Sequence, residues 1–162
     1  MTVDAGRPKR PPTAQRIQAA RQRAGLSHEV VASRVGLDLP SYYDLEAFDE
    51  EAFTVISLRQ LCSLASVLGV SARALVGDDP AELPAVAPSA VVEQIRAGLG
   101  GDPPDVDAFS ARVGWDVAAV LDDPEWIWDD WCVDALADIC GAIGVHWLAV
   151  LADGLAPAAE RQ

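Results

Sequence analysis

Apolar residues follow a helical period in the first half of the chain. Ile17, Ala20 and Ala24 stand at positions i, i+3 and i+7, which places them on one face of a helix. A later helix is predicted by a longer apolar stripe, made of Leu58, Leu61, Leu64, Ala65 and Leu68. No stretch alternates between apolar and polar residues over a useful length, so no strand is predicted. Residues 13–77 are therefore predicted to be helical throughout.

Turn and capping residues divide this segment into five short helices. Gly25 ends the first helix, and Ser27 can cap the start of the second. Gly36 supplies the tight turn that follows, and Asp38 can cap the third helix. The caps expected at the starts of the last two helices are Ser57 and Ser71.

Residues 89–155 show a second helical pattern that resembles the first. At a shift of 78 residues, the turn glycine Gly36 falls on Gly114. After a three-residue shortening the shift becomes 75, and Gly69 falls on Gly144. Turn glycines, caps and apolar faces stay in register, which favours a degenerate tandem repeat over two unrelated amphipathic domains. The predicted fold class is all-α, with two small helical bundles in tandem.

Three segments outside the predicted bundles have compositions of their own. Residues 1–12 form a basic, proline-rich arm, which we expect to be flexible. Residues 78–88 contain three prolines and three carboxylates, a composition typical of a linker. Residues 156–162 follow the second bundle as a tail.

Charge is distributed unevenly between the two halves. The net charge is −13, which as a bulk value argues against nucleic-acid binding. Residues 1–77, however, hold nine basic and eight acidic side chains, whereas residues 78–162 hold three basic and seventeen acidic ones. The excess of positive charge lies within residues 1–36. Such asymmetry indicates two halves with different roles.

Several classes of protein are disfavoured by what the sequence lacks. No apolar run approaches the roughly 20 residues needed to span a bilayer, and the N-terminus has no apolar signal core. Cys62, Cys132 and Cys140 lack metal-ligand spacing, which is typical of buried thiols in a reducing cytoplasm. No catalytic, phosphate-binding or calcium-binding motif is present. We therefore expect a cytoplasmic protein with no enzymatic activity, cofactor or metal site.

The order of residues in the first segment is that of a known family. From Ile17 to Leu37 the chain follows the pattern I-x-x-A-R-x-x-A-G-L-S-x-E-x-x-A-x-R-V-G-L. From Leu58 to Val76 it follows L-x-x-L-x-x-L-A-x-x-L-G-V-S-x-x-x-L-V. Together these resemble the lambda-repressor-like helix-turn-helix family, also called the XRE or Cro/repressor type. The resemblance covers about 65 residues and implies a five-helix bundle whose second and third helices bind duplex DNA, with the chain acting as a homodimer.

The resemblance also implies a set of DNA-contacting positions. The third helix would present Leu39, Pro40, Tyr43, Asp44 and Ala47 to the major groove. The start of the second helix would contribute His28, where the family commonly has glutamine. Phosphate contacts would come from the arm and the first helix, through Arg7, Lys9, Arg10 and Arg16.

The third helix departs from the family at these positions. None of them is the arginine or lysine that binds guanine through two hydrogen bonds. Carboxylates would instead crowd the phosphates, at Asp44, Glu46, Asp49, Glu50 and Glu51. The alternative is therefore a helix-turn-helix scaffold that has lost its DNA-binding role.

The second half carries all five tryptophans of the chain. Trp126, Trp128 and Trp131 cannot share one helical face, so one or two of them are expected to be exposed or at an interface. With Asp129 and Asp130 they form the predicted protein-interaction surface. The alternative is that these indoles fill a small core.

Two functions remain open from the sequence. In the first, the chain is a DNA-binding transcriptional regulator, and its acidic second copy serves oligomerisation or partner binding. In the second, the chain is a protein-interaction module on a helix-turn-helix scaffold, either an adaptor, an antitoxin-like partner or a nucleic-acid mimic. An enzyme is the least favoured class, because no nucleophile, base or metal ligand set converges in the sequence.

Overall fold

The computed structural model describes residues 11–77 and 83–151, which contain helices and no β-strand. This confirms the all-α fold class. Residues 1–10, with Arg7, Lys9 and Arg10 of the predicted basic arm, lie outside the described residues. The same holds for residues 78–82 of the predicted linker and for the tail.

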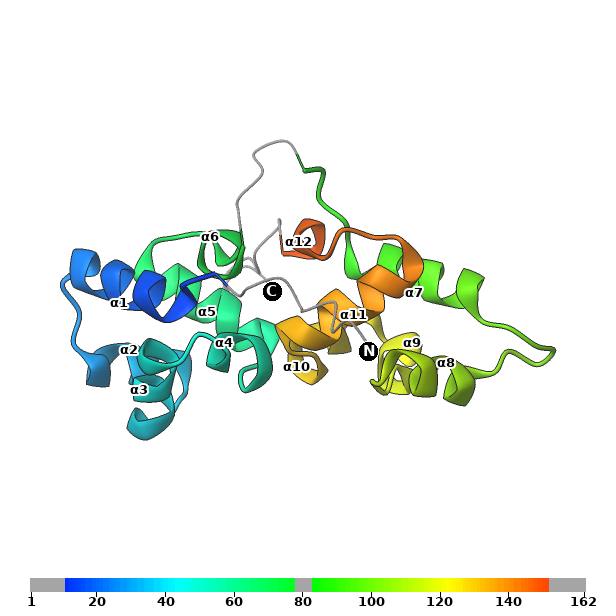
Figure 1. Cartoon of the computed structure of the whole chain (residues 1–162), viewed down its shortest axis with the longest axis horizontal. Helices are drawn as coiled ribbons and strands as arrows, with labels where there is room; N and C mark the ends of the chain where they lie inside the picture. The colour runs from blue at the N-terminus through cyan, green and yellow to red at the C-terminus, as the bar shows by residue number, and fades with distance from the viewer. Residues whose placement is uncertain (1–10, 78–82, 152–162) are drawn as a thin grey trace, which may run out of the picture.

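Six helices form the first half (Figure 1). They are α1 (Thr13–Ala24), α2 (His28–Val35), α3 (Leu39–Ala47), α4 (Glu51–Thr54), α5 (Leu58–Leu68) and α6 (Ala72–Val76). Ser27, Ser57 and Ser71 cap α2, α5 and α6, because each hydroxyl accepts a hydrogen bond from the backbone N–H three residues later. The single turn α4 is an addition to the five helices that the sequence predicts.

The helices of the second half repeat those of the first. They are α7 (Pro88–Gly98), α8 (Val106–Val113), α9 (Ala118–Asp122), the 3-10 turn η1 (Pro124–Trp126), α10 (Ile127–Asp130), α11 (Val133–Ile143) and α12 (Trp147–Val150). Both bounds of α8 equal those of α2 at the shift of 78, and both bounds of α11 equal those of α5 at the shift of 75. Gly114 and Gly144 end their helices in the left-handed conformation, as Gly36 and Gly69 do. This agreement supports the tandem repeat.

The two halves meet in one hydrophobic core. α5 packs on α10 and α4 packs on α11, so the single-turn helices of each half contact the long helix of the other. The backbone N–H of Leu58 donates to the carbonyl of Trp131 at 2.9 Å. Arg59 binds the carboxylate of Asp129 through two hydrogen bonds of 2.6 and 3.0 Å. These contacts form what we call the central interface.

The described part of the predicted linker packs against the helices. The N–H of Val86 donates to the carbonyl of Ala149 at 3.0 Å, and Leu83 and Val86 are partly buried against the core. The buried Arg73 donates to the carbonyl of Leu148 at 2.8 Å. α7 already begins at Pro88, the last residue assigned to the linker from the sequence. Arg73 of α6 also donates to the carbonyl of Leu83 at 3.4 Å, so residues 83–87 contact both halves.

The turn between α2 and α3 provides a test of the local fold. Gly36 has φ of 78°, and a Cβ there would meet no atom within 4 Å. Replacement of Gly36 by alanine should therefore lower the free energy of unfolding by about 1–2 kcal/mol through backbone strain alone. Urea unfolding followed by circular dichroism measures the change.

Gly98 provides the matched control for Gly36. It ends α7, has no positive φ, and likewise has open space around it. Alanine at Gly98 should leave the stability unchanged or raise it by up to about 1 kcal/mol, because alanine favours the helix. Equal losses at the two glycines would contradict the assigned turn.

Candidate functional site

The second and third helices are joined by a short turn with local supports at both ends. The Ser27 hydroxyl accepts from the N–H of Val30 at 3.3 Å, which starts α2. Gly36 ends α2 in the left-handed conformation, and the Asp38 carboxylate accepts from the N–H of Ser41 at 2.8 Å, which starts α3. The intervening turn is therefore short and well defined, as in helix-turn-helix units.

Glu46 of α3 joins the first three helices. Its carboxylate binds the guanidinium of Arg21 on α1 at 2.6 and 3.1 Å. The Tyr42 hydroxyl donates to it at 2.7 Å, and the His28 Nε2 lies 3.2 Å from it. Arg21 also donates to the carbonyl of Leu26 between α1 and α2. Because the Glu46 and Arg21 side chains are only 5% and 10% exposed, this cluster is part of the interior of the bundle.

The ionisation of the cluster follows from these contacts. Burial alone would raise the pKa of Glu46, but hydrogen bonds from Arg21 and Tyr42 outweigh it and hold that pKa below its ordinary value. Burial and the hydrogen bond to Glu46 raise the pKa of Tyr42. Glu46 is therefore ionised, and its negative charge is balanced by the guanidinium of Arg21. The expectation that it repels phosphates is wrong, because Arg21 neutralises it inside the protein.

Asp49 has a structural role as well. Its carboxylate accepts from the backbone N–H of Ala14 at 3.0 Å, in the first turn of α1. Pro12 at the N-cap of α1 makes no side-chain cap. Asp49, which is distant in the sequence, therefore accepts a hydrogen bond from a backbone N–H of the first turn that would otherwise have no partner. Of the five carboxylates expected around the third helix, Asp44 and Glu50 are exposed and Glu51 is half-buried.

Two predicted cationic contacts are used within the fold. Arg16 donates to the carbonyls of Ala74 and Gly77, at 3.2 and 2.8 Å, and so binds the end of α6. Its guanidinium is thus engaged at the end of α6, and its contact with DNA phosphates stays a prediction. His28 contacts Glu46, and its ring centroid lies 4.7 Å from that of Tyr43 with the two rings tilted by 42°. His28 is thus held by the protein rather than presented as a free donor.

The exposed side of α2 and α3 is apolar and acidic. Val30 is 37% exposed and Tyr43 is 45% exposed. Pro40 and Asp44 are exposed beside them, and Leu39 is half-buried. We call this surface the α2–α3 face, and its exposed members are Glu29, Val30, Arg34, Asp38, Pro40, Tyr43 and Asp44.

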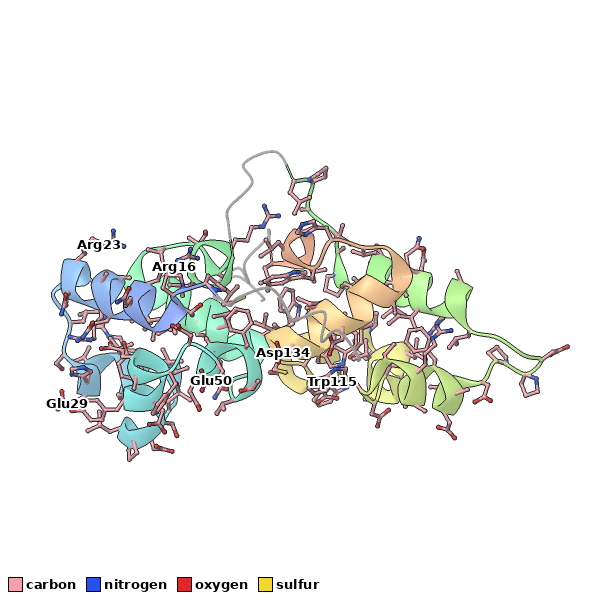
Figure 2. All side chains as sticks on the ribbon, in the orientation of Figure 1. Arg16, Arg23, Glu29, Glu50, Trp115 and Asp134 are labelled. Carbon is pink, nitrogen blue, oxygen red and sulfur yellow. The ribbon has the colours of Figure 1, made fainter. Side chains whose placement is uncertain are left out.

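Cations are scarce on the α2–α3 face. Arg34 is the only arginine or lysine between residues 28 and 47, and it lies in the last turn of α2. Figure 2 shows Arg23 on the upper side of α1 and Glu29 on the opposite side of the first half. The described cations of α1 therefore do not extend the face. Its three carboxylates outnumber its one guanidinium.

The predicted surface of the second half is mostly interior. Trp128 and Trp131 are 5% and 2% exposed, whereas Trp126 is 48% exposed. Asp129 is bound to Arg59, whose hydrogen bonds lower the pKa of the aspartate. Of the five predicted residues, Trp126 and Asp130 are exposed and lie outside this ion pair. Burial of Trp128 and Trp131 corrects their assignment to a protein-interaction surface and agrees with the core alternative.

The internal repeat contains the signal for this burial. At the shift of 75, Phe53 falls on Trp128 and Ile56 falls on Trp131, and both first-half residues are buried. The sequence-based prediction used this shift only at Gly69 and its counterpart Gly144, which lies after the tryptophan-rich run. Extension of the same shift backwards would have placed both indoles in the core.

The described residues also bear on metal sites, reactive cysteines and membrane-spanning helices. Among residues 11–77 and 83–151, no group of three or more histidine, cysteine or acidic side chains is arranged to hold a metal ion. Cys62 and Cys140 are buried, and burial raises the pKa of the Cys140 thiol to about 12. None of the described helices is both long and apolar enough to cross a membrane.

Comparisons with known proteins add no relatives. No family model, no curated protein and no solved structure matches the chain. The similarity to the lambda-repressor-like family therefore stays a prediction from the residue pattern.

Proposed function

We propose that this chain is a protein-interaction module built on a helix-turn-helix scaffold, and that its α2–α3 face binds a cationic protein surface. The observation that supports the proposal is the composition of that face. Apolar Val30 and Tyr43 are exposed beside carboxylates, whereas DNA binding at the same place needs cations and hydrogen-bond donors.

The partner that suits this face has basic side chains around an apolar centre. Tyrosine beside smaller apolar groups is typical of the centre of protein interfaces, and charged groups are typical of the rim. Asp44 lies on α3 one residue from Tyr43, and both are exposed. A lysine or arginine of the partner would pair with Asp44 while Tyr43 enters an apolar contact.

Charge reversal at Asp44 tests this function. The immobilised full chain, its Asp44→Lys variant and its Glu93→Lys variant are compared for the cellular proteins that each retains. Glu93 is exposed on α7, so the control changes the net charge equally away from the face. We expect Asp44→Lys to reduce retention of a basic partner by more than about tenfold, because like charges would then meet. Glu93→Lys should retain it.

Binding of duplex DNA is the second candidate, and the observation that favours it is the helix-turn-helix geometry of α2, Gly36 and α3. The sequence adds the basic residues Arg7, Lys9 and Arg10 ahead of the first helix. Fluorescence anisotropy with labelled duplex DNA at low and moderate salt distinguishes the candidates. Binding that weakens steeply with salt and is increased by Asp44→Lys would contradict the protein-interaction proposal. Absence of binding at low salt would exclude the DNA-binding role.

A further inference from the structure

The contacts between the halves occur in exchanged pairs. α5 packs against α10, and α4 packs against α11. In the repeat, α10 is the counterpart of α4 and α11 is the counterpart of α5. Exchange of the two halves therefore converts the α5–α10 contact into the α4–α11 contact. Such reciprocal contacts are typical of a two-fold dimer interface. α6 also contacts its own counterpart α12, through the hydrogen bond from Arg73 to Leu148.

This arrangement places the two helix-turn-helix units in corresponding positions. Figure 1 shows α2 and α3 at the lower left and α8 and α9 at the lower right, with α4 and α10 between them. α6 and α12 lie near the centre at the top of the same view. The chain therefore resembles a two-fold dimer whose subunits are joined covalently. A surface that a single copy would use for self-association is occupied by the other half.

Four exposed charges of the first helix-turn-helix unit each have an exposed counterpart in the second unit, which also exposes Asp105, Asp123 and Glu125. In the α2–α3 face they are Glu29, Arg34, Asp38 and Asp44, and at the shift of 78 they fall on Asp107, Arg112, Asp116 and Asp122. All eight side chains are exposed. The signs agree at every position. We call the second surface, which also exposes Ala108 and Ala118, the α8–α9 face.

Helix stability explains some of these charges but not all. Asp38 caps α3, and Arg34 and Arg112 lie in the last turns of their helices, where cations are favourable. Asp44 lies in the last turn of α3, and Asp122 is the last residue of α9. Carboxylates there face the negative ends of the helix dipoles, so they are unfavourable for the helices that carry them. Their presence in both halves points to a role outside the fold.

We propose that the α8–α9 face is a second docking surface for the same kind of cationic protein surface, an inference that rests on the function proposed above. One chain then presents two faces, which its internal two-fold symmetry relates to each other. The protein partner that would bind both faces is itself two-fold symmetric. The second face binds more weakly, because Leu121, the counterpart of Tyr43, is buried. The two-fold relation is already complete within one chain, so the structure favours a monomer over the homodimer that the family resemblance implies.

The experiment counts the sites on the full chain. The probe is an amphipathic helical peptide of lysine and leucine, titrated by isothermal calorimetry into the wild type and into four variants. The variants are Asp44→Lys, Asp122→Lys, the double variant, and Glu93→Lys as the control of equal charge. Sedimentation equilibrium of the same samples reports the mass of the free chain.

The proposal expects two peptides per chain for the wild type and for Glu93→Lys. It expects one peptide for each single variant, none for the double variant, and a free mass of 17.1 kDa. One peptide on the wild type, lost with Asp44→Lys and unchanged by Asp122→Lys, overturns the second face and leaves the proposed function standing. Binding that Glu93→Lys weakens as much as Asp44→Lys, or no saturable binding, overturns both. A mass of twice that value for the free chain overturns the proposal that the two halves of one chain take the place of a homodimer.

Discussion

Replacement of Glu46 by alanine lowers the free energy of unfolding by about 3–5 kcal/mol, because the buried Arg21 guanidinium then loses its counter-ion. Arg21 keeps its hydrogen bond to the carbonyl of Leu26, but among the described residues it forms no ion pair with another carboxylate. Tyr42 loses its acceptor in the same variant. Three helices are therefore affected by one substitution. Urea unfolding of the purified variant measures the loss.

Two further variants distinguish the ion pair from general damage to α3. Asp44→Ala removes an exposed carboxylate from the same helix and should change stability by no more than about 0.5 kcal/mol. The double variant Arg21→Met with Glu46→Leu should recover part of the loss, since an apolar pair leaves no charge unpaired. A Glu46→Ala variant as stable as Asp44→Ala would show that the cluster contributes nothing.

The same pair predicts the direction of a pH dependence. The pKa of Glu46 in the folded protein lies below its ordinary value of 4.5, so the carboxylate stabilises the fold fully above that value. As the pH falls through the lowered pKa, Glu46 is protonated and this stabilisation is lost. The stability difference between the wild type and Glu46→Gln should thus be constant near neutral pH and shrink in acid. A difference that grew in acid would contradict the assignment.

Replacement of Trp131 by alanine lowers the free energy of unfolding by about 3–5 kcal/mol, because it leaves a cavity in the central interface. The indole is 2% exposed, and the backbone of the same residue accepts a hydrogen bond from Leu58 of the other half. Loss of its packing therefore weakens both the core and the contact between halves. Denaturant unfolding followed by circular dichroism measures the change.

Trp126 and a phenylalanine variant provide the controls for Trp131. Trp126 is 48% exposed, so Trp126→Ala should cost less than about 1 kcal/mol. The Nε1 of Trp131 is buried without a hydrogen-bond partner among the described residues. Trp131→Phe removes this unpaired donor, and its loss should be well below that of alanine. Equal losses for Trp126→Ala and Trp131→Ala would place the central interface elsewhere.

The candidate site could be predicted from the sequence only in its local framework. The positions of α2, its turn and α3 follow from caps and glycines that act within a few residues, so Ser27, Gly36 and Asp38 were sufficient to locate them. The state of their side chains was not predictable in this way. His28 and Arg16 were assigned to DNA, although each is engaged with residues far along the chain.

Sequence alone determined the longer helices and their repetition, because helical periodicity, capping and glycine turns are short-range properties. Tertiary structure alone decided which charges remain available. The pairs Arg21–Glu46, Asp49–Ala14 and Arg59–Asp129 join residues far apart in the chain, and such pairing depends on distances that only packing sets. Packing also buried Trp128 and Trp131 between the halves. It left Tyr43 and Asp44 exposed on the α2–α3 face, so the functional proposal rests on what folding did not neutralise or bury.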